Sequence, residues 1–342
     1  MKREEIVVGI IGLVMGRHHL ESALKCGVNV GAICDIDEAQ LKKIGDEFGV
    51  PEEKRFTDYH DLLNNPEINV VLLVVPDQLH LTMTEEFLAA GKHVLCEKPL
   101  ALTREELKGI IRATDASDKK FMVGQICHFT PAFIKAKELL DSGAIGELYY
   151  VESEYAHDYH WIMHGWRRDP NRHGVVGGGC HAVDLLRWFA GDPEEVFAYG
   201  THKLLPMADY NDATIAVLKF PNKVIGKVFV STGCKRNYTM RTVIYGTKGT
   251  IVVDNTSPTM SLFLAEINGE EKVFGTKAIN IEHKIPVKIA NHNVAAEIAE
   301  FCECILTNTE PRISAEEGAR AVAACEAIIR SSATGKPEKI VY

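Results

Sequence analysis

An acid, a base and a proline stand side by side at Glu97, Lys98 and Pro99, directly after the apolar run HVLC. If this run is a strand of a parallel sheet, Lys98 projects into the crevice at the carboxyl end of that strand. An ammonium group there can stabilise the alkoxide character of an oxygen as a hydride leaves its carbon, and Glu97 can hold the ammonium in place. The alternative is a surface ion pair, which is the commoner use of an isolated Glu–Lys pair.

A glycine turn near the start of the chain supplies a second chemical feature. It lies in GIIGLVMGRHH, residues 9–19, which follows an apolar strand and opens a helix. In that context backbone N–H groups and a helix N-terminus can hold a pyrophosphate. Gly12 and Gly16 are present, but the middle glycine of the usual G-x-G-x-x-G is missing, so a tight turn without a ligand is the alternative. We expect a dinucleotide to contact Gly12, Leu13, Val14 and Met15.

Asp35 ends the second predicted strand, about twenty residues beyond the glycines, where a carboxylate can accept hydrogen bonds from the adenosine ribose. For Asp35 alone, an exposed turn acid is the alternative. Residues 36–39, IDEA, offer no arginine or lysine for a 2′-phosphate, so NAD is favoured over NADP. The next buried strand ends in VVPDQLH, residues 74–80, which places Pro76 and His80 along the dinucleotide. The predicted NAD-binding residues therefore also include Asp35, Pro76, His80, Glu97 and Lys98.

The elements that must position these residues alternate in the first third of the chain, as in a doubly wound parallel sheet. Strands are predicted at 6–12, 28–35, 69–75, 93–97 and 120–125, and helices at 18–26, 37–49, 80–91 and 103–117. Longer runs at 147–158, 212–220, 223–233 and 240–254 predict a large, mostly antiparallel open sheet. Further helices are predicted at 132–143, 180–191, 293–306 and 314–335, the last opened by Ser314 and Glu317 at capping-box spacing.

This pattern predicts an α/β protein with two domains. Residues 1–125 are expected to form an NAD-binding Rossmann domain with a doubly wound parallel sheet. Residues 126–342 are expected to form an α/β domain for substrate binding and oligomerisation, and its last helices are able to pack back on the first domain. A chain of 342 residues is long enough for two such domains.

The motifs together resemble those of the Gfo/Idh/MocA oxidoreductases, which include inositol and glucose-fructose oxidoreductases. The resemblance runs nearly end to end and is carried by GIIGLVMGRHH, CDID, VVPDQLH, AAGKHVLCEKPLA, FTPAFIKAKELLDSGAIGEL, GWRRDP, GGGCHAVDLLRWFAGD and AIIRSSATGKP. The strand-terminal E-K-P and the G-x-H-x-x-D are the specific motifs. The resemblance implies a Rossmann domain, then an α/β domain whose open sheet often packs against a second subunit, and hydride transfer between a nicotinamide and a sugar, polyol or related ring carbon.

By this resemblance Lys98 matches the active-site lysine of the family and His181 its catalytic histidine. Histidine titrates near neutrality, so it can take the hydroxyl proton in oxidation and return it in reduction. Asp184 follows three residues later on a helical pattern and can share a face with His181, or it is a helix N-terminal acid without a catalytic part. Many relatives carry an aspartate where this chain has Gly177. Either His181 acts with Lys98 alone, or Asp158 or Asp184 substitutes, or glycine admits a larger substrate.

A histidine-rich segment, AHDYHWIMHGWRRDPNRHG, covers residues 156–174. Its polar and aromatic groups include His157, Asp158, His160, Trp161, His164, Trp166 and His173. Imidazoles and a carboxylate could bind zinc or manganese if this loop folded back on itself, but we predict no metal. The predicted sugar contacts are Tyr155, His157, Trp166 and Arg167, with subunit packing as the alternative for each.

Composition excludes several functional classes. The formal net charge is −9 without an offsetting basic stripe, which argues against nucleic-acid binding as the main task. No apolar run approaches the roughly 18 residues of a membrane-spanning helix, and the start lacks the cleavage site of a secretory signal. Nine cysteines are scattered without metal-type spacing, as in a protein with reduced thiols. We expect a cytoplasmic homodimer or homotetramer that binds neither nucleic acid nor membrane.

The function predicted by these features is NAD-dependent oxidation of a secondary hydroxyl of a sugar, glycoside or cyclitol. Three alternatives remain open. The physiological direction could be reduction of a keto sugar, or NAD could stay bound and be recycled. A third alternative is a dinucleotide-binding regulator that has lost the chemistry, although the presence of both Lys98 and His181 argues against it.

Overall fold

The structure is a computed structural model that describes residues 3–267, 278–290 and 292–342. Met1 and Lys2, the first residues of the segment tested for a secretory signal, lie outside the described residues. Two compact units are present: unit 1 comprises Met1–Ile126 and Asn293–Val322, and unit 2 comprises Cys127–His292 and Ala323–Tyr342.

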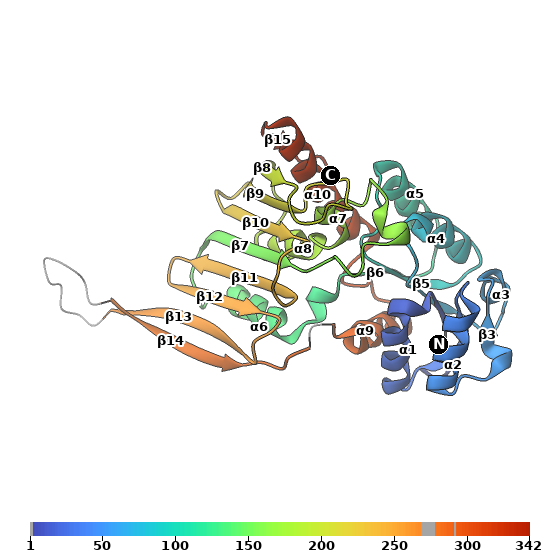
Figure 1. Ribbon diagram of the computed structural model, residues 1–342. Helices are drawn as coiled ribbons and strands as arrows, with labels where there is room; N and C mark the ends of the chain where they lie inside the picture. The colour runs from blue at the N-terminus through green and yellow to red at the C-terminus, as the bar shows by residue number, and fades with distance from the viewer. Residues whose placement is uncertain (1–2, 268–277, 291) are drawn as a thin grey trace, which may run out of the picture. The chain divides into compact units, whose positions relative to one another are not determined.

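Unit 1 is built on a six-stranded sheet with the order β3-β2-β1-β4-β5-β6, in which every neighbouring pair is parallel (Figure 1). Its strands are β1 (Val7–Ile11), β2 (Asn29–Cys34), β3 (Arg55–Phe56), β4 (Val70–Leu73), β5 (His93–Glu97) and β6 (Phe121–Gly124). The strand order reverses between β1 and β4, and ligands of such sheets bind outside the carboxyl ends of the strands at this point. The predicted Rossmann fold is confirmed.

Helices connect the strands of unit 1, and a further helix from late in the chain, α9 (Val294–Thr307), belongs to the same unit. The connecting helices are α1 (Leu13–Lys25), α2 (Glu38–Phe48), α3 (His60–Leu63), α4 (His80–Ala89) and α5 (Arg104–Asp115), with short 3-10 turns η1 (Arg3–Glu5), η2 (Glu52–Lys54) and η3 (Asp77–Leu79). Sequence signals set several ends: Gly49 is left-handed after α2, and Thr103 and Glu106 form a complete capping box on α5. Helix α1 begins at Leu13, five residues before the predicted start, because the turn after β1 passes directly into the helix.

Unit 2 is built on a nine-stranded sheet with the order β14-β13-β12-β11-β7-β10-β9-β8-β15. Its strands are β7 (Leu148–Ala156), β8 (Glu195–Thr201), β9 (Ala213–Lys219), β10 (Ile225–Ser231), β11 (Thr239–Gly246), β12 (Gly249–Asp254), β13 (Thr259–Ile267), β14 (Ala278–Pro286) and β15 (Glu338–Lys339). Strands β7 and β10 pair in parallel, and the other paired strands with a described register are antiparallel. The predicted mostly antiparallel sheet is confirmed.

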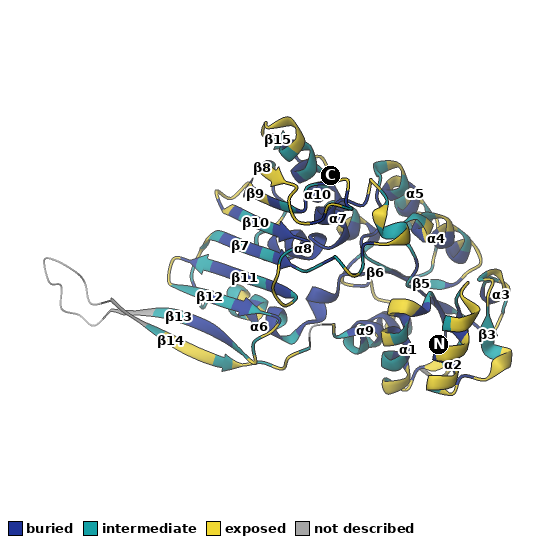
Figure 2. Cartoon of the chain, in the orientation of Figure 1, coloured by how far each residue is buried: buried dark blue, intermediate teal, exposed yellow. Residues whose placement is uncertain are grey.

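The helices of unit 2 are α6 (Pro131–Asp141), α7 (Gly174–Gly177) and α8 (Cys180–Ala190), with 3-10 turns η4 (Ile126–Phe129) and η5 (Gly165–Arg168). Helix α10 (Ala315–Thr334) begins in unit 1 and ends in unit 2. Helix α8 packs on β7, β10 and β11, and nearly all of it is buried (Figure 2). Strand β9 alternates buried and exposed residues, so one face of the sheet is covered and the other faces outward.

Candidate active site

The glycine turn of unit 1 brings its backbone close to the end of β4. Gly12 has φ +84°, and a β-carbon there would overlap the carbonyl oxygen of Val74, so the position requires glycine. Helix α1 starts directly after this turn, and its first-turn side chains Val14 and Met15 are exposed. A bare backbone, a helix N-terminus and two exposed apolar side chains at the switch point fit a dinucleotide. Direct contact of NAD with these residues remains a prediction.

Asp35 follows β2 and is held at the same turn. Its Oδ2 accepts the backbone N–H of Leu13 at 2.7 Å, and its Oδ1 accepts that of Asp37 at 3.0 Å. The carboxylate therefore stands at the positive end of helix α1, where a negative charge is favourable. This position fits an acceptor for the adenosine ribose. Pro76 lies three residues after the end of β4, where it precedes the turn η3 and is partly exposed.

Lys98 lies at the carboxyl end of β5, as predicted from its place in the sequence. Its backbone N–H donates to Oε2 of Glu97 at 3.1 Å, so the acid holds the turn at its first residue. His80 supports the turn from behind: its Nδ1 lies 3.1 Å from the carbonyl oxygen of Pro99, and its Nε2 lies 3.3 Å from that of Val75. The sequence predicts His80 along the cofactor, but its ring is fully buried among carbonyls because the turn folds over it.

Behind Lys98, unit 1 contains three buried or half-buried ionisable groups. Nε2 of His19, on α1, lies 3.2 Å from Oε1 of Glu97. Burial opposes ionisation of Glu97, but His19 and Lys98 outweigh it, and the pKa of Glu97 is lowered to about 2. Glu97 is therefore a carboxylate at neutral pH.

Glu297, on α9, behaves oppositely. It is completely buried, and within the described part of the chain neither of its carboxyl oxygens has a hydrogen-bond partner. Burial, followed by the negative charge of Glu97 and then that of Glu300, raises the pKa of Glu297 well above its usual value. A proton on Glu297 removes the cost of a buried charge. Nothing in the sequence around position 297 distinguishes this acid from its exposed helix neighbours.

His181 lies in the first turn of α8 in unit 2 and is almost completely buried. Its ring centroid is 6.1 Å from that of Tyr155 and 6.5 Å from that of His292. Its Nδ1 lies 3.7 Å from Sγ of Cys127, which is itself 3.5 Å from Sδ of Met240. These named neighbours are aromatic rings and sulfur atoms rather than carboxylates.

Around His181 the rings form what we call the aromatic cluster, namely Tyr155, His157, Tyr159, Tyr238 and His292. The hydroxyl of Tyr155 is 2.9 Å from that of Tyr159 and 3.1 Å from Nδ1 of His157. Burial raises the pKa of Tyr155 and of Tyr238 well above the usual value, so both phenols stay protonated. Two predicted sugar contacts, Tyr155 and His157, thus lie with the predicted base, although sugar binding itself remains a prediction.

The three glycines before His181 are there for packing reasons. A β-carbon at Gly177 would overlap the guanidinium of Arg172, so a buried arginine fills the place of a side chain at this position. A β-carbon at Gly178 would lie 2.6 Å from the ring of Tyr155 and would overlap the hydroxyl of Tyr159. The glycine run therefore lets α7 and α8 pack against Arg172 and the aromatic cluster.

Asp184 shares helix α8 with His181, and its carboxylate is engaged by two other side chains. Its Oδ2 lies 2.8 Å from Nε2 of His128, and its Oδ1 lies 3.7 Å from Nη1 of Arg187. The ring of His128 also stacks on Trp188. These buried contacts give Asp184 a structural place in the fold, and its predicted catalytic part has no support from them.

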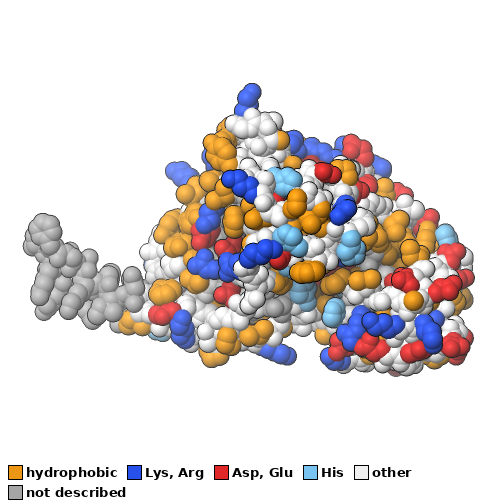
Figure 3. All heavy atoms as spheres, viewed as in Figure 1, with side chains coloured by type: hydrophobic (Ala, Val, Ile, Leu, Met, Phe, Trp, Pro, Cys, Tyr) orange, Lys and Arg blue, Asp and Glu red, His pale blue; other side chains and the backbone are white. Residues whose placement is uncertain are grey.

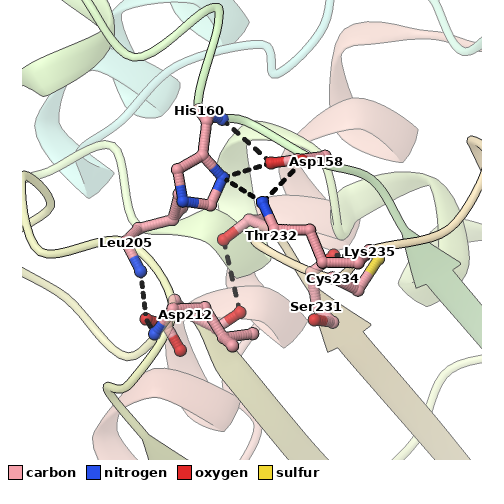
Figure 4. A network of polar contacts seen from close by, with 9 residues as sticks. Asp158, His160, Leu205, Asp212, Ser231, Thr232, Cys234 and Lys235 are labelled. Atoms are coloured by element: carbon pink, nitrogen blue, oxygen red, sulfur yellow. Dashed lines mark hydrogen bonds and ion pairs between the residues drawn. The ribbon is translucent and has the colours of Figure 1, made fainter.

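The histidine-rich segment divides into an anchored part and a stacked part. Asp158 contacts Nδ1 of His160 and accepts from Nζ of Lys235 at 2.9 Å (Figure 4). Lys235 and then His160 hold the pKa of Asp158 well below its usual range. His173 accepts the backbone N–H of Val175 at 3.0 Å, and burial lowers the pKa of His173 to about 4.

The stacked part consists of Trp166 and Arg167 in the turn η5 together with Arg172. The guanidinium carbons of Arg167 and Arg172 lie 4.3 Å and 4.8 Å from the ring centroid of Trp166. Trp161 is largely exposed. Within the described residues no group of three or more His, Cys, Asp or Glu side chains is arranged to hold a metal ion.

Sequence reasoning missed Glu297 and His19 behind Lys98, and Cys127, Tyr238 and Met240 beside His181. His19 closes the glycine-turn motif GIIGLVMGRHH, but its place beside Glu97 was not predicted, and the other four belong to no motif. Tyr238 directly precedes β11 and Met240 lies in it, and their spacing of two residues is a local signal that could have placed both on the same face.

Lys and Arg side chains are intermixed with Asp and Glu on the face of the molecule seen in Figure 3. No described helix combines the length and the low polarity that crossing a bilayer requires.

Known proteins resemble both parts of the chain. Residues 6–125 match the oxidoreductase family with an NAD-binding Rossmann fold, and residues 133–252 match the GFO/IDH/MocA C-terminal domain. The oxidoreductase YrbE of Bacillus subtilis is 28% identical in an alignment 355 positions long, which covers 99% of this chain and 98% of that protein. The myo-inositol 2-dehydrogenase of Thermotoga maritima is 26% identical, with 92% of each chain covered.

Among solved structures, a levoglucosan dehydrogenase in complex with NADH has a TM-score of 0.86. The identity is 23%, and the alignment covers 98% of this chain and 99% of that chain, so this likeness speaks for the fold alone. The glycine turn, the strand-terminal Lys98, and the two matches that together span more than half of the sequence agree. The chain belongs to the Gfo/Idh/MocA family of NAD-binding oxidoreductases.

Proposed function

We propose that this protein is an NAD-dependent dehydrogenase that oxidises a secondary hydroxyl of a sugar, glycoside or cyclitol. The observation that carries the proposal is the turn of Lys98. It stands at the carboxyl end of a Rossmann strand, its backbone is held by the carboxylate of Glu97, and Gly12 and Asp35 lie at the carboxyl ends of strands of the same sheet. A lysine in that position is available for electrostatic work on a reacting oxygen.

In the proposed reaction NAD, when bound, supplies the nicotinamide that accepts the hydride. Lys98 stabilises the negative charge that develops on the substrate oxygen as the hydride leaves. His181 takes the hydroxyl proton as general base and returns it as general acid in the reverse direction. Asp184 is left out of these roles because His128 and Arg187 engage its carboxylate.

The substrate class is proposed from two supports. One is the aromatic cluster beside His181, since tyrosine rings and hydroxyls can contact both the apolar face and the hydroxyls of a ring. The other is the names of relatives, which include inositol 2-dehydrogenases and a levoglucosan dehydrogenase of Pseudarthrobacter phenanthrenivorans that is 28% identical over 236 residues. All of these names denote cyclic polyols or sugars.

The test is a panel of sugars, cyclitols and glycosides mixed with purified protein and NAD, followed through the absorbance of the reduced cofactor. At least one ring alcohol is expected to give steady formation of NADH, and the matching ketone should give the reverse reaction. NAD binding without turnover of any ring alcohol, in either direction, would contradict the proposal. A single-turnover absorbance change that stays with the protein on gel filtration would show that NAD is recycled while bound.

We propose that a second copy of this chain covers the outward face of the nine-stranded sheet. Exposed apolar side chains on three adjacent strands support this: Tyr199 on β8, Ile215 on β9 and Ile225 on β10. Tyr199 and Ile215 are direct cross-strand neighbours. An apolar face of this kind is normally covered in a stable oligomer. Ile215→Lys is expected to lower the molar mass measured by light scattering, and an unchanged mass would contradict this proposal.

All nine cysteines are free, which fits a reducing compartment, and we propose the cytoplasm as the location. Fractionation of cells that express a tagged full chain tests it, because recovery outside the cytoplasmic fraction would contradict it.

A further inference from the structure

Three buried side chains of unit 2, Met240, Cys127 and His181, form a line of successive contacts that ends at His181. Nδ1 of His181 lies 3.7 Å from Sγ of Cys127, and this sulfur lies 3.5 Å from Sδ of Met240. Cys127 and Met240 are fully buried, and His181 is 1% exposed. The three residues come from η4, β11 and α8, so only folding brings them together.

The chemistry of the two sulfur atoms fixes the direction of one contact, because between Cys127 and Met240 only the thiol can donate. A thioether can only accept a hydrogen bond, whereas a thiol carries one hydrogen and can also accept. When the Cys127 S–H donates to Met240, the Cys127 sulfur can meet His181 only as an acceptor. In that arrangement the contact between Cys127 and His181 calls for a hydrogen on Nδ1 of His181.

We propose that Cys127 and Met240 are positioning residues that keep neutral His181 in the tautomer with a proton on Nδ1. This leaves the lone pair on Nε2, the nitrogen that would take the hydroxyl proton. The inference deepens and rests on the proposed function, because it concerns the state of the proposed base. We call Cys127 and Met240 together the sulfur relay. It consists of two uncharged groups, whereas many hydrolases use a carboxylate to fix the tautomer of their catalytic histidine.

Met240, the acceptor in these contacts, is fixed in place by hydrogen bonds of its backbone. The backbone N–H of Met240 donates to Oδ1 of Asn255 at 2.7 Å, and the N–H of Asn255 donates to the carbonyl of Met240 at 3.1 Å. The hydroxyl of Tyr238 donates to the same sulfur at 3.3 Å. Burial keeps this phenol protonated, so the Met240 sulfur receives two donors and offers none.

The direct test uses the intact protein in the presence of NAD, with ¹⁵N-labelled histidine. The chain has fourteen histidines, and loss of one signal set in His181→Asn assigns the ring. Two-bond ¹H–¹⁵N spectra at a pH where the ring is neutral report which nitrogen is protonated. A proton on Nδ1 supports the proposal, and a ring protonated mainly on Nε2 overturns it. This measurement needs no variant at the relay residues.

The kinetic test uses a double-variant design. In Met240→Leu the thiol loses its acceptor and can turn its hydrogen toward Nδ1, which favours the wrong tautomer. We expect kcat to fall about tenfold with little change in KM, the size of one displaced hydrogen bond. Adding Cys127→Ala removes the competing hydrogen, so the double variant should be more active than Met240→Leu alone. Losses that simply add would overturn the relay.

Two further variants complete the design. Cys127→Ser keeps one donor and an acceptor, and its kcat is expected within about threefold of the original chain. Met260→Leu is the matched control, because Met260 is equally buried on β13 of the same sheet. A tenfold loss in Met260→Leu would make packing the cause and overturn the assignment to the relay. If Met240→Leu does not fold, the ¹⁵N spectra and Cys127→Ser decide.

Failure of this inference differs from failure of the proposed function. If His181→Asn leaves turnover unchanged, His181 is not the base, whatever its tautomer. If His181→Asn abolishes turnover while neutral His181 carries its proton on Nε2, the proposed base stands and the sulfur relay falls.

Discussion

Around Lys98 in unit 1 the polar groups are two acids and an imidazole: the Glu97 carboxylate, His19 beside it, and the buried Glu297, which faces Glu97. Around His181 in unit 2 the named neighbours are phenols, imidazoles, a thiol and a thioether. A carboxylate near an ammonium group favours its charged form, which a lysine needs if it is to stabilise an oxyanion. A general base must begin the reaction without its proton, and the thioether and the protonated phenols near His181 bring no negative charge to it. The two regions therefore differ in the kind of group that they place near their central residues.

The largest expected effect comes from removing the charge in unit 1. Lys98→Ala should lower kcat by about 10²- to 10³-fold, the cost of losing one group that stabilises an oxyanion. The dissociation constant of NAD, measured by fluorescence titration, should change by less than about threefold. Lys108→Ala, at an exposed position of α5, is the control. Parallel losses of turnover and NAD affinity would place Lys98 in cofactor binding instead.

The packing of unit 2 can be broken at a single glycine. A β-carbon at Gly178 would press into Tyr155 and Tyr159, so Gly178→Ala should lower the free energy of unfolding by about 2–3 kcal/mol. Gly16→Ala in unit 1 is the counterpart, because its β-carbon would find no atom closer than 3.4 Å and alanine favours the helix. Denaturant unfolding of both variants measures the difference. Equal unfolding free energies of the two variants would mean that Tyr155 and Tyr159 can move aside without a loss of stability.

We expect the carboxylate of Asp35, at the glycine turn of unit 1, to influence the choice between NAD and NADP. Asp35→Asn keeps an acceptor for the Leu13 N–H while it removes the charge that repels a 2′-phosphate. The ratio of NADP to NAD dissociation constants should fall about tenfold, an effect of roughly 1.4 kcal/mol. Asp37→Asn, at the N-cap of α2, should leave that ratio unchanged. An unaltered ratio in Asp35→Asn would show that the carboxylate does not select the cofactor.

The smallest expected effect concerns the proton on Glu297. Its folded pKa is raised, so its contribution to stability is complete below the unfolded pKa of about 4.3 and is lost as the pH rises toward the folded value. The glutamine in Glu297→Gln cannot ionise, so this variant does not lose stability in this way as the pH rises. Its unfolding free energy relative to the original chain should rise by at least about 1 kcal/mol between pH 5 and pH 8.

The neighbouring groups allow a matched control for Glu297. The charges that face it are Glu97 on β5 and Glu300 on its own helix, with His19 and Lys98 acting on Glu97. Glu303→Gln changes an exposed acid of the same helix and should show no such pH dependence. If the pH dependence of Glu297→Gln matches that of the original chain, Glu297 is already ionised in the folded protein.

Much of the fold follows from local patterns in the sequence. Short apolar runs and amphipathic runs alternate in unit 1, and the capping residues Thr103 and Gly49 mark the helix ends, because a cap acts within one turn. Local signals also predict that Lys98 lies at a strand end, because the apolar run HVLC and the proline that follows Lys98 are close to it in the sequence. The family resemblance added His181.

The surroundings of these two residues were decided by the tertiary structure alone. Glu297 faces Glu97 from a helix far along the chain, and Cys127 and, through it, Met240 reach His181 from two other elements. The contacts that bury His80 and engage Asp184 arise in the same way, and motif position gave no indication of them. Sequence periodicity states which face of an element is buried. It does not state which distant side chain meets that face, because packing of the whole unit sets that contact.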